Sequence, residues 1–186
     1  RKLLAQIKHT ITITENNSVF AEVLRSAWSD FNNPSVFTKG KDVIALITGP
    51  LSATDIADVR VLLEWARFSE SAQDFFKKVE ITTFSSDSKR TKLQAFRTHL
   101  NAVNGTDVPG EDFCLFLRHF HLLGYDLDIK AGVMHAILHS LIGRYSRENP
   151  QAVFAQIIEE VSFANQSAGT ISRDSLSEEL RAAFTA

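Results

Sequence analysis

The alternation of apolar and polar residues predicts strands only near the beginning of the chain. Residues 3–14 (LLAQIKHTITIT) end in a β-branched stretch where Ile11 and Ile13 alternate with threonines, which is the period of a half-buried strand. Residues 43–47 (VIALI) form a continuous apolar run that Gly49 stops, and such a run is typical of a strand covered on both faces. We therefore expect two strands in the first fifty residues and none after Gly49.

Apolar residues at helical spacing predict helices over most of the remaining chain. A first stripe runs from Phe20 to Phe31 and ends at an Asn-Pro pair, because a residue before proline resists the α region. A second helix is expected over residues 52–66, where Ser52 can cap the first turn. Six later stripes, at residues 75–79, 93–103, 113–123, 133–145, 153–161 and 176–184, each predict a helix. The pattern thus favours an α/β fold that is mostly α, with a helical lobe over residues 51–186.

The two predicted strands do not complete a sheet. Three or more strands, or cover from helices, are normally needed for a stable sheet, and the apolar strand at residues 43–47 needs hydrogen-bonding neighbours on both edges. The chain also starts without methionine and inside its first predicted strand. We therefore expect the missing strands to lie before Arg1 or in a partner chain, so that this sequence is an interior piece of a larger protein.

Composition narrows the classes of function. The formal charge of −2, from 20 basic and 22 acidic residues, gives no global polybasic signal, so any DNA-binding surface must be local or supplied by missing parts. No apolar run is long enough to predict a membrane span. Cys114 is the only cysteine, which excludes an internal disulfide and a cysteine-based zinc site. Its apolar neighbours predict a buried thiol, and a reducing, cytoplasmic setting is expected.

The tripeptide Gln6-Ile7-Lys8 is the strongest candidate for chemistry. Side chains two residues apart on a strand point to the same face, so Gln6 and Lys8 are expected to lie together. A strand with this spacing, followed by a helix and a second apolar strand, resembles the end of the PD-(D/E)xK nuclease core. In that core an acid or amide and a lysine, placed in this way, form half of the catalytic site.

The resemblance to this core assigns a role to each of the three residues. Gln6 would be a side-chain ligand of Mg²⁺, Ile7 a ligand through its backbone carbonyl, and Lys8 the catalytic lysine that orients or deprotonates the attacking water. The resemblance also implies an upstream aspartate on a neighbouring strand, which this chain does not contain. We therefore expect Mg²⁺ only in the complete core, and no activity from this chain alone.

A broader resemblance covers most of the chain. The segments QIKHT, DVIALITGPLSATDIADVRVLLEWAR and FHLLGYDLDIKAGVMHAILHSLIG resemble the N-terminal effector region of bacterial antiviral STAND NTPases, where a nuclease similar to the effector of CBASS anti-phage systems precedes the ATPase. This implies an endonuclease for double-stranded DNA that is active as a homo-oligomer of the parent protein. A P-loop of the form G-x-x-x-x-G-K-[ST] does not occur here, so the ATPase itself is not included.

Three interpretations follow from these patterns. In the first, residues 1–50 are the C-terminal part of a restriction-endonuclease-like core, and the protein is a metal-dependent DNA endonuclease effector. In the second, the chain is a non-catalytic helical adaptor or oligomerisation module that links sensor and effector, with Gln6 and Lys8 as ordinary strand residues. In the third, it is a helical domain of unrelated function. An aspartate on a strand shortly before Arg1 would favour the first.

Other polar groups have simpler interpretations. His135 and His139 lie one helical turn apart, but HAILH lacks the glutamate of the zinc-protease motif, so exposed or boundary positions are favoured. His119 and His121 are expected at a boundary as well.

Two further groups combine charge with helix ends. Asp126 and Asp128 are interpreted as a helix cap and its solvated neighbour. Four basic residues near a helix start could touch a phosphate backbone, but a solvated helix face is favoured because both signs of charge occur nearby. They are Lys89, Arg90, Lys92 and Arg97.

Overall fold

The computed structural model describes residues 1–186 except 50, 126–131, 167–170 and 185–186, and it divides into two compact units. The N-terminal unit is Arg1–Tyr125 and the C-terminal unit is Asp126–Ala186. The observed division therefore differs from the expected boundary at residue 50. The reason is that helices after residue 50 share one hydrophobic core with the first fifty residues.

The N-terminal unit is built on a parallel sheet of three strands, β1 (Leu3–Lys8), β2 (Val43–Thr48) and β3 (Phe120–Gly124), in the order β1-β2-β3. β2 has a hydrogen-bonded neighbour on each edge, which confirms the expectation for the apolar strand. One of these neighbours, β3, comes from far along the same chain. The prediction that no strand follows Gly49 is therefore wrong.

β3 also corrects the helix that was predicted through residue 123. Helix α5 (Gly110–His119) ends at His119, and Phe120 is already extended. A short apolar run such as FHLLG fits a helical stripe and a strand equally well, and pairing with β2 decides between them. Phe120 and Leu122 are buried on the same face as Ile44 and Leu46, which a helix at this place could not achieve.

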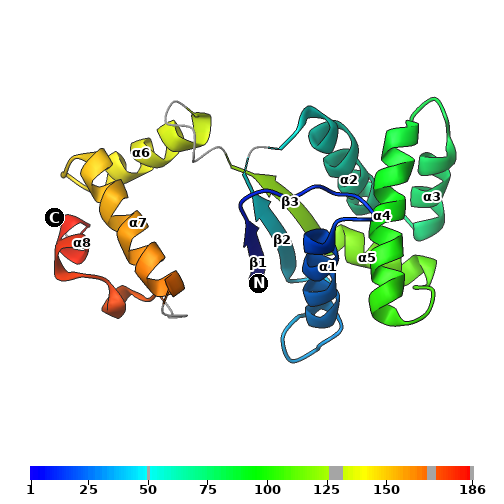
Figure 1. The fold of residues 1–186 in the computed structure, drawn as a ribbon, viewed down its shortest axis with the longest axis horizontal. Coiled ribbons are helices and arrows are strands. Elements are labelled where there is room, and N and C mark those ends of the chain that lie inside the picture. Colours follow the sequence, from blue (N-terminus) through cyan, green and yellow to red (C-terminus); the bar gives the residue numbers. More distant parts are fainter. Residues whose placement is uncertain (50, 126–131, 167–170, 185–186) are drawn as a thin grey trace. The chain divides into compact units, whose positions relative to one another are not determined.

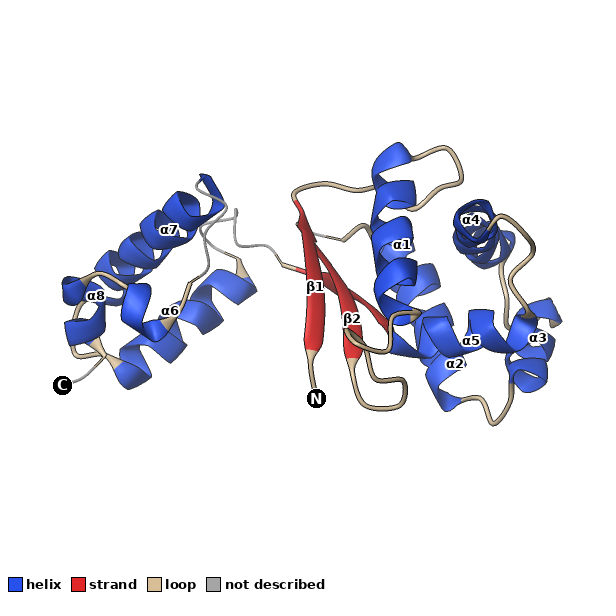
Figure 2. Cartoon of the chain, turned by 90° about the horizontal axis from the view of Figure 1, so that it is seen from below, coloured by secondary structure: helices blue, strands red, loops and turns tan. Residues whose placement is uncertain are grey.

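Helix α1 (Ser18–Phe31) covers one face of the sheet (Figure 2). The side chain of Asn17 caps it by accepting a hydrogen bond of 2.8 Å from the backbone N–H of Phe20. Its apolar stripe is the predicted one, and Phe20 and Leu24 are fully buried. This face of the sheet is therefore part of the core of the unit.

Four more helical segments complete the N-terminal unit. They are the π-helical turn η1 (Asp55–Arg60) with α2 (Val61–Phe68), then α3 (Ala72–Glu80), α4 (Asp87–Asn104) and α5. The predicted helix at residues 52–66 is thus realised as η1 and α2. α4 packs against α1 and η1, and α5 packs against α2 and α3. Most of the large fully buried side chains are phenylalanines, namely Phe20, Phe31, Phe75, Phe96, Phe113, Phe116 and Phe120.

The C-terminal unit is helical in its described part. It contains α6 (Val133–Tyr145), α7 (Pro150–Gln166), the 3-10 turn η2 (Arg173–Ser175) and α8 (Glu178–Ala183). The three predicted helices are confirmed. A small core of its own holds the unit together, formed by Ile142, Val153, Leu180 and Ala183. Across both units, the described helices are too short or too polar to cross a bilayer.

The loop that leads into β2 is fixed by two polar side chains. Asp42 accepts hydrogen bonds from the backbone N–H groups of Lys2, at 2.6 Å, and Thr38, at 2.9 Å. These bonds hold the pKa of Asp42 below its ordinary value. His119 accepts from the N–H of Gly40 through Nε2, so its Nδ1 carries the proton and donates to the carbonyl of Asp42. His119 therefore has a structural role at the end of α5.

Replacing Asp42 with asparagine should destabilise the protein in a pH-dependent way. The amide has a single, neutral acceptor oxygen, so one of the two backbone donors loses its acceptor and the other keeps only an uncharged one. Because the folded-state pKa of Asp42 is lowered, its contribution is present above the unfolded-state value of about 3.9 and is lost as pH falls through the folded-state value. In urea titrations, the free energy of unfolding of Asp42→Asn should be lower than that of the unsubstituted protein at pH 7, and this difference should shrink below about pH 4. A deficit that is constant with pH would contradict this.

The aromatic core offers a matched pair of substitutions. Phe116 is fully buried, with ring centroids 5.4 Å from Trp28 and Phe31 and 5.6 Å from Phe120. Phe116→Ala should lower the free energy of unfolding by about 3–5 kcal/mol, through lost burial and the cavity left behind. Phe68 is 81% exposed, and Phe68→Ala should change it by less than about 0.5 kcal/mol. Similar effects of both in urea titrations would refute this core assignment.

Candidate functional site at the carboxyl end of β1

β1 presents its polar residues to helix α1. Leu4, Gln6 and Lys8 are half-buried, whereas Leu3 and Ile7 on the opposite face are 58% and 75% exposed. The spacing of two residues thus places Gln6 and Lys8 on one face, as the sequence predicts. That face is the one covered by α1 (Figure 2).

The side chain of Gln6 is oriented by the backbone of α1. Its Nε2 donates a hydrogen bond of 3.2 Å to the carbonyl oxygen of Val23. Because a carbonyl can only accept, the amide nitrogen must face the helix, and the amide oxygen Oε1 points away from that carbonyl. This hydrogen bond therefore orients the amide of Gln6 so that its Oε1 is directed away from the carbonyl of Val23.

Lys8 meets an acidic residue that the sequence analysis did not single out. Its Nζ lies 3.8 Å from the Oε2 of Glu22 on α1, and the two side chains are 30% and 68% exposed. Glu22 lies beside the buried stripe of the helix, next to Val23. The sequence indicates only that the helix after β1 packs on the sheet, because that helix connects two parallel strands.

The backbone of Ile7 faces the outer edge of the sheet. Lys2 accepts a hydrogen bond of 3.0 Å from the N–H of Val43, and alternate residues of a parallel strand bond to the same neighbour. The N–H and C=O groups of Leu3, Ala5 and Ile7 are consequently directed away from β2. Among the described residues, no strand pairs with this edge of β1.

The three strands are parallel, so their carboxyl ends meet at one edge of the sheet. Open α/β sheets bind ligands at this edge. Gly49 keeps β1 and β2 close there: its N–H donates to the carbonyl of His9 at 3.2 Å, and a Cβ at this position would lie 2.7 Å from that oxygen. Lys8 is thus the last residue of β1, at the carboxyl edge of the sheet.

The oxygen atoms at this edge match the type that Mg²⁺ takes, but they carry little charge. Gln6 Oε1 and the carbonyl of Ile7 are neutral, and the described residues contain no group of three acidic, histidine or cysteine side chains that could hold a metal. Magnesium is usually bound through one or two carboxylates. The two oxygens are of the type that Mg²⁺ takes, but without a carboxylate they do not form a magnesium site by themselves.

The basic residues of α4 are used inside the fold. Lys89 pairs with Asp58 and Lys92 pairs with Asp55, each at 3.1 Å and with every one of these side chains at most 15% exposed. Arg90 bonds to Asp87 and to the carbonyl of Ser85, and Arg97 lies over the rings of Phe76 and Phe113. The expected solvated face is corrected for three of the four: Lys89 and Lys92 bind η1 and Arg97 lies on the aromatic core, whereas Arg90 binds at the start of its own helix.

Other sequence candidates do not form a site. The rings of His135 and His139 lie 4.1 Å apart against Phe154, without a third metal ligand among the described residues. Cys114 is buried as predicted, and burial raises the pKa of its thiol. Asp126 and Asp128 lie outside the described residues.

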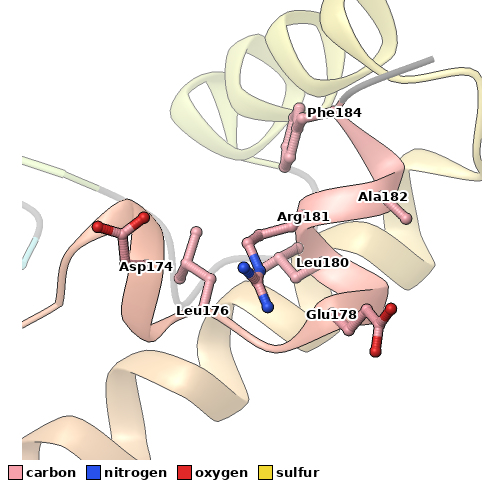
Figure 3. A pocket seen from close by; sticks show the side chains of 7 residues that line it. All are labelled: Asp174, Leu176, Glu178, Leu180, Arg181, Ala182 and Phe184. Atoms are coloured by element: carbon pink, nitrogen blue, oxygen red, sulfur yellow. The ribbon is translucent and has the colours of Figure 1, made fainter.

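Two surface hollows differ from this edge in character. One, of about 400 Å³, lies on the sheet face opposite α1 and is mostly apolar, with His121 at its wall. The pKa of His121 is lowered, first by burial and then by the charge of Arg67. The other, of about 740 Å³, belongs to the C-terminal unit and mixes one arginine with acidic and apolar side chains (Figure 3). Neither gathers residues with an evident catalytic arrangement.

Comparisons with protein-family models, with curated proteins and with solved structures found no match for this chain. Its function has therefore to be inferred from the geometry around β1 and from the resemblance of its sequence segments. The geometry around β1 can be tested directly by substitution, because Lys8 and Glu22 are accessible and lie outside the apolar core.

Lys8 should contribute little to the free energy of unfolding if its role is catalytic. Its ion pair with Glu22 is long and partly exposed, and such pairs stabilise proteins by about 1 kcal/mol or less. Lys8→Ala should therefore cost no more than about 1 kcal/mol in urea unfolding. Lys92→Ala is the contrasting variant, because it leaves Asp55 and the carbonyl of Ile13 without their buried cation, and its cost should be clearly larger. A larger cost for Lys8→Ala would point to a structural role.

Proposed function

We propose that the Arg1–Tyr125 unit belongs to a metal-dependent endonuclease that cuts double-stranded DNA, with a restriction-endonuclease-like core, and that it is an effector of prokaryotic anti-phage defence. The observation that carries the proposal is the placement of Gln6 and Lys8. They lie on one face at the carboxyl end of an edge strand, followed by a covering helix and a parallel neighbour. The resemblance to antiviral effectors adds DNA as substrate and a homo-oligomer as the active form.

Lys8 suits a role in phosphodiester cleavage. Its side chain is 30% exposed, and among the described residues its ammonium forms one ion pair, with Glu22. A cation held in this way can meet a phosphate oxygen and offset the negative charge that develops during attack by water. It can also orient that water by a hydrogen bond. Both roles require the side chain to be fixed at one end and free at the other.

Mg²⁺, when bound, would supply Lewis-acid stabilisation of the phosphate. Gln6 through Oε1 and Ile7 through its carbonyl are the residues of β1 that would hold it. The outer edge of β1 can accept one more strand, which would bring the expected aspartate beside Gln6. This strand belongs to the proposal, as does the double-stranded DNA substrate.

A second candidate function is favoured by the surface of the C-terminal unit. Large apolar side chains are exposed on its helices, with Tyr145 at 62%, Ile158 at 47% and Val161 at 46%. Exposed apolar surface of this kind often marks contact with another protein. We propose that this unit is a helical adaptor or oligomerisation module, which is compatible with a nuclease in the other unit. If the whole chain were an adaptor, Gln6 and Lys8 would be ordinary strand residues.

Cleavage of supercoiled plasmid in Mg²⁺, by the protein at its full natural length and in its assembled state, tests the proposed function. Lys8→Ala should cut at least about a hundredfold more slowly, because a charge that stabilises the transition state is lost. Lys77→Ala, an exposed lysine of α3, is the matched control and should cut normally. Equal cutting by the protein and its Lys8→Ala variant would refute the role of Lys8. No cutting at all would favour the adaptor.

A further inference from the structure

We propose that His99 of helix α4 is a positioning residue for Gln6, because it fixes the start of α1 and thereby the helix backbone that orients the Gln6 amide. This inference rests on the proposed function, in which Gln6 takes part in the site. It assigns a role to a residue far from β1 in the sequence. The contacts lead from α4 to the turn before α1, along α1 to Val23, and from Val23 to Gln6.

Helix α4 holds the connection between β1 and α1 through two consecutive carbonyl groups. Lys92 donates to the carbonyl of Ile13 at 3.0 Å, and His99 bonds to the carbonyl of Thr14 at 3.0 Å. Because a carbonyl can only accept, the Nε2 of His99 carries the proton. Lys92 also pairs with Asp55 of η1, so its contact serves two places in the fold. The bond from His99 acts on the connection alone.

His99 also contacts the first turn of α1. The carbonyl of Thr14 accepts a second hydrogen bond, of 3.3 Å, from the N–H of Asn17, which is the N-cap of this helix. The ring of Phe20 lies edge-on to the imidazole of His99, with 5.4 Å between the ring centroids. His99 is 7% exposed and Phe20 is fully buried, and close packing leaves such side chains little room to move. One residue of α4 thus fixes both the cap and the first buried ring of α1.

The start of α1 decides where the carbonyl of Val23 lies. Val23 follows Phe20 by three residues on the same buried stripe, which is less than one helical turn. A shift of the first turn therefore carries the carbonyl of Val23 with it. The Nε2 of Gln6 donates to this carbonyl at 3.2 Å, the upper end of the usual range for N–H···O bonds. A displacement of about 0.5 Å away from β1 would break the bond.

Packing alone does not explain a histidine at this position. Its neighbours on the inner face of α4, Phe96 and Leu100, are apolar and buried, and an apolar side chain at position 99 would bury more apolar surface. The carbonyl of Thr14 already has a partner in the N–H of Asn17, so it does not need the imidazole to avoid an unpaired acceptor. A buried polar group that local packing does not require is expected where a site is maintained.

The test is a ¹H–¹⁵N spectrum of the glutamine side-chain amides, recorded on the protein at its full natural length, with Gln6→Glu to identify the Gln6 signal. His99→Leu removes the donor at similar volume and should shift this signal, because the bond to Val23 is lost. His99→Gln restores a donor and should return the signal toward its original position. Thr91→Ala, an exposed residue of α4 whose hydroxyl bonds within its own helix, should leave it unchanged.

The outcomes separate this inference from the proposed function. An unchanged Gln6 signal in folded His99→Leu would overturn the role of His99, since a general loss of stability leaves the folded spectrum as it was. If His99→Leu does not fold, Phe20→Leu, which removes the ring that His99 contacts, takes its place with the same two outcomes. In plasmid cleavage, His99→Leu should lower kcat about tenfold or more at unchanged KM. If the signal shifts while Lys8→Ala cuts normally, the role of His99 stands and the role of Lys8 falls.

Discussion

The parallel pairing of β1 with β2 is the constraint on which the candidate site depends. Two parallel strands joined through one helix require that helix to lie on a face of the sheet, and the buried stripe of α1 chooses the face that carries Ile44 and Leu46. Gln6 and Lys8 then lie beneath or beside α1, since every second residue of β1 points there. The site is thus a consequence of strand pairing and of the apolar contacts behind it, and it is placed on elements that the core holds rigid.

Polar residues at this place are not explained by packing alone. Leu4 in the same row contacts the core, and apolar side chains at positions 6 and 8 would bury more apolar surface against α1. A sequence that places an amide and an ammonium there departs from the rule that the covered face of a sheet is apolar. Such departures are expected where a site is maintained for function. This departure is a physical argument, beyond the tripeptide itself, for the proposed site at Gln6 and Lys8.

Several other charges of the N-terminal unit hold its helices together. Burial alone would raise the pKa of Asp58, but hydrogen bonds from Ser88 and Lys89 outweigh it and lower the pKa. Together with the pair of Lys92 and Asp55, this network attaches the π-helical turn η1 to α4. These lysines are mostly shielded from solvent, so a basic run in the sequence does not become a basic surface. Binding of DNA by this unit would depend on cations nearer to β1, Lys8 among them.

The sequence by itself determined the elements whose pattern extends over several turns or a full strand. The stripe of α1, the apolar run of β2 and the helix that ends before Gly105, whose φ is 75°, were all predictable because local periodicity and turn chemistry fix them. It also placed Gln6 and Lys8 on one face. Only the tertiary structure decided that FHLLG is strand β3, that the N-terminal unit extends to Tyr125, and that Glu22 meets Lys8. Each of these depends on contacts between residues distant in sequence, which no local period encodes.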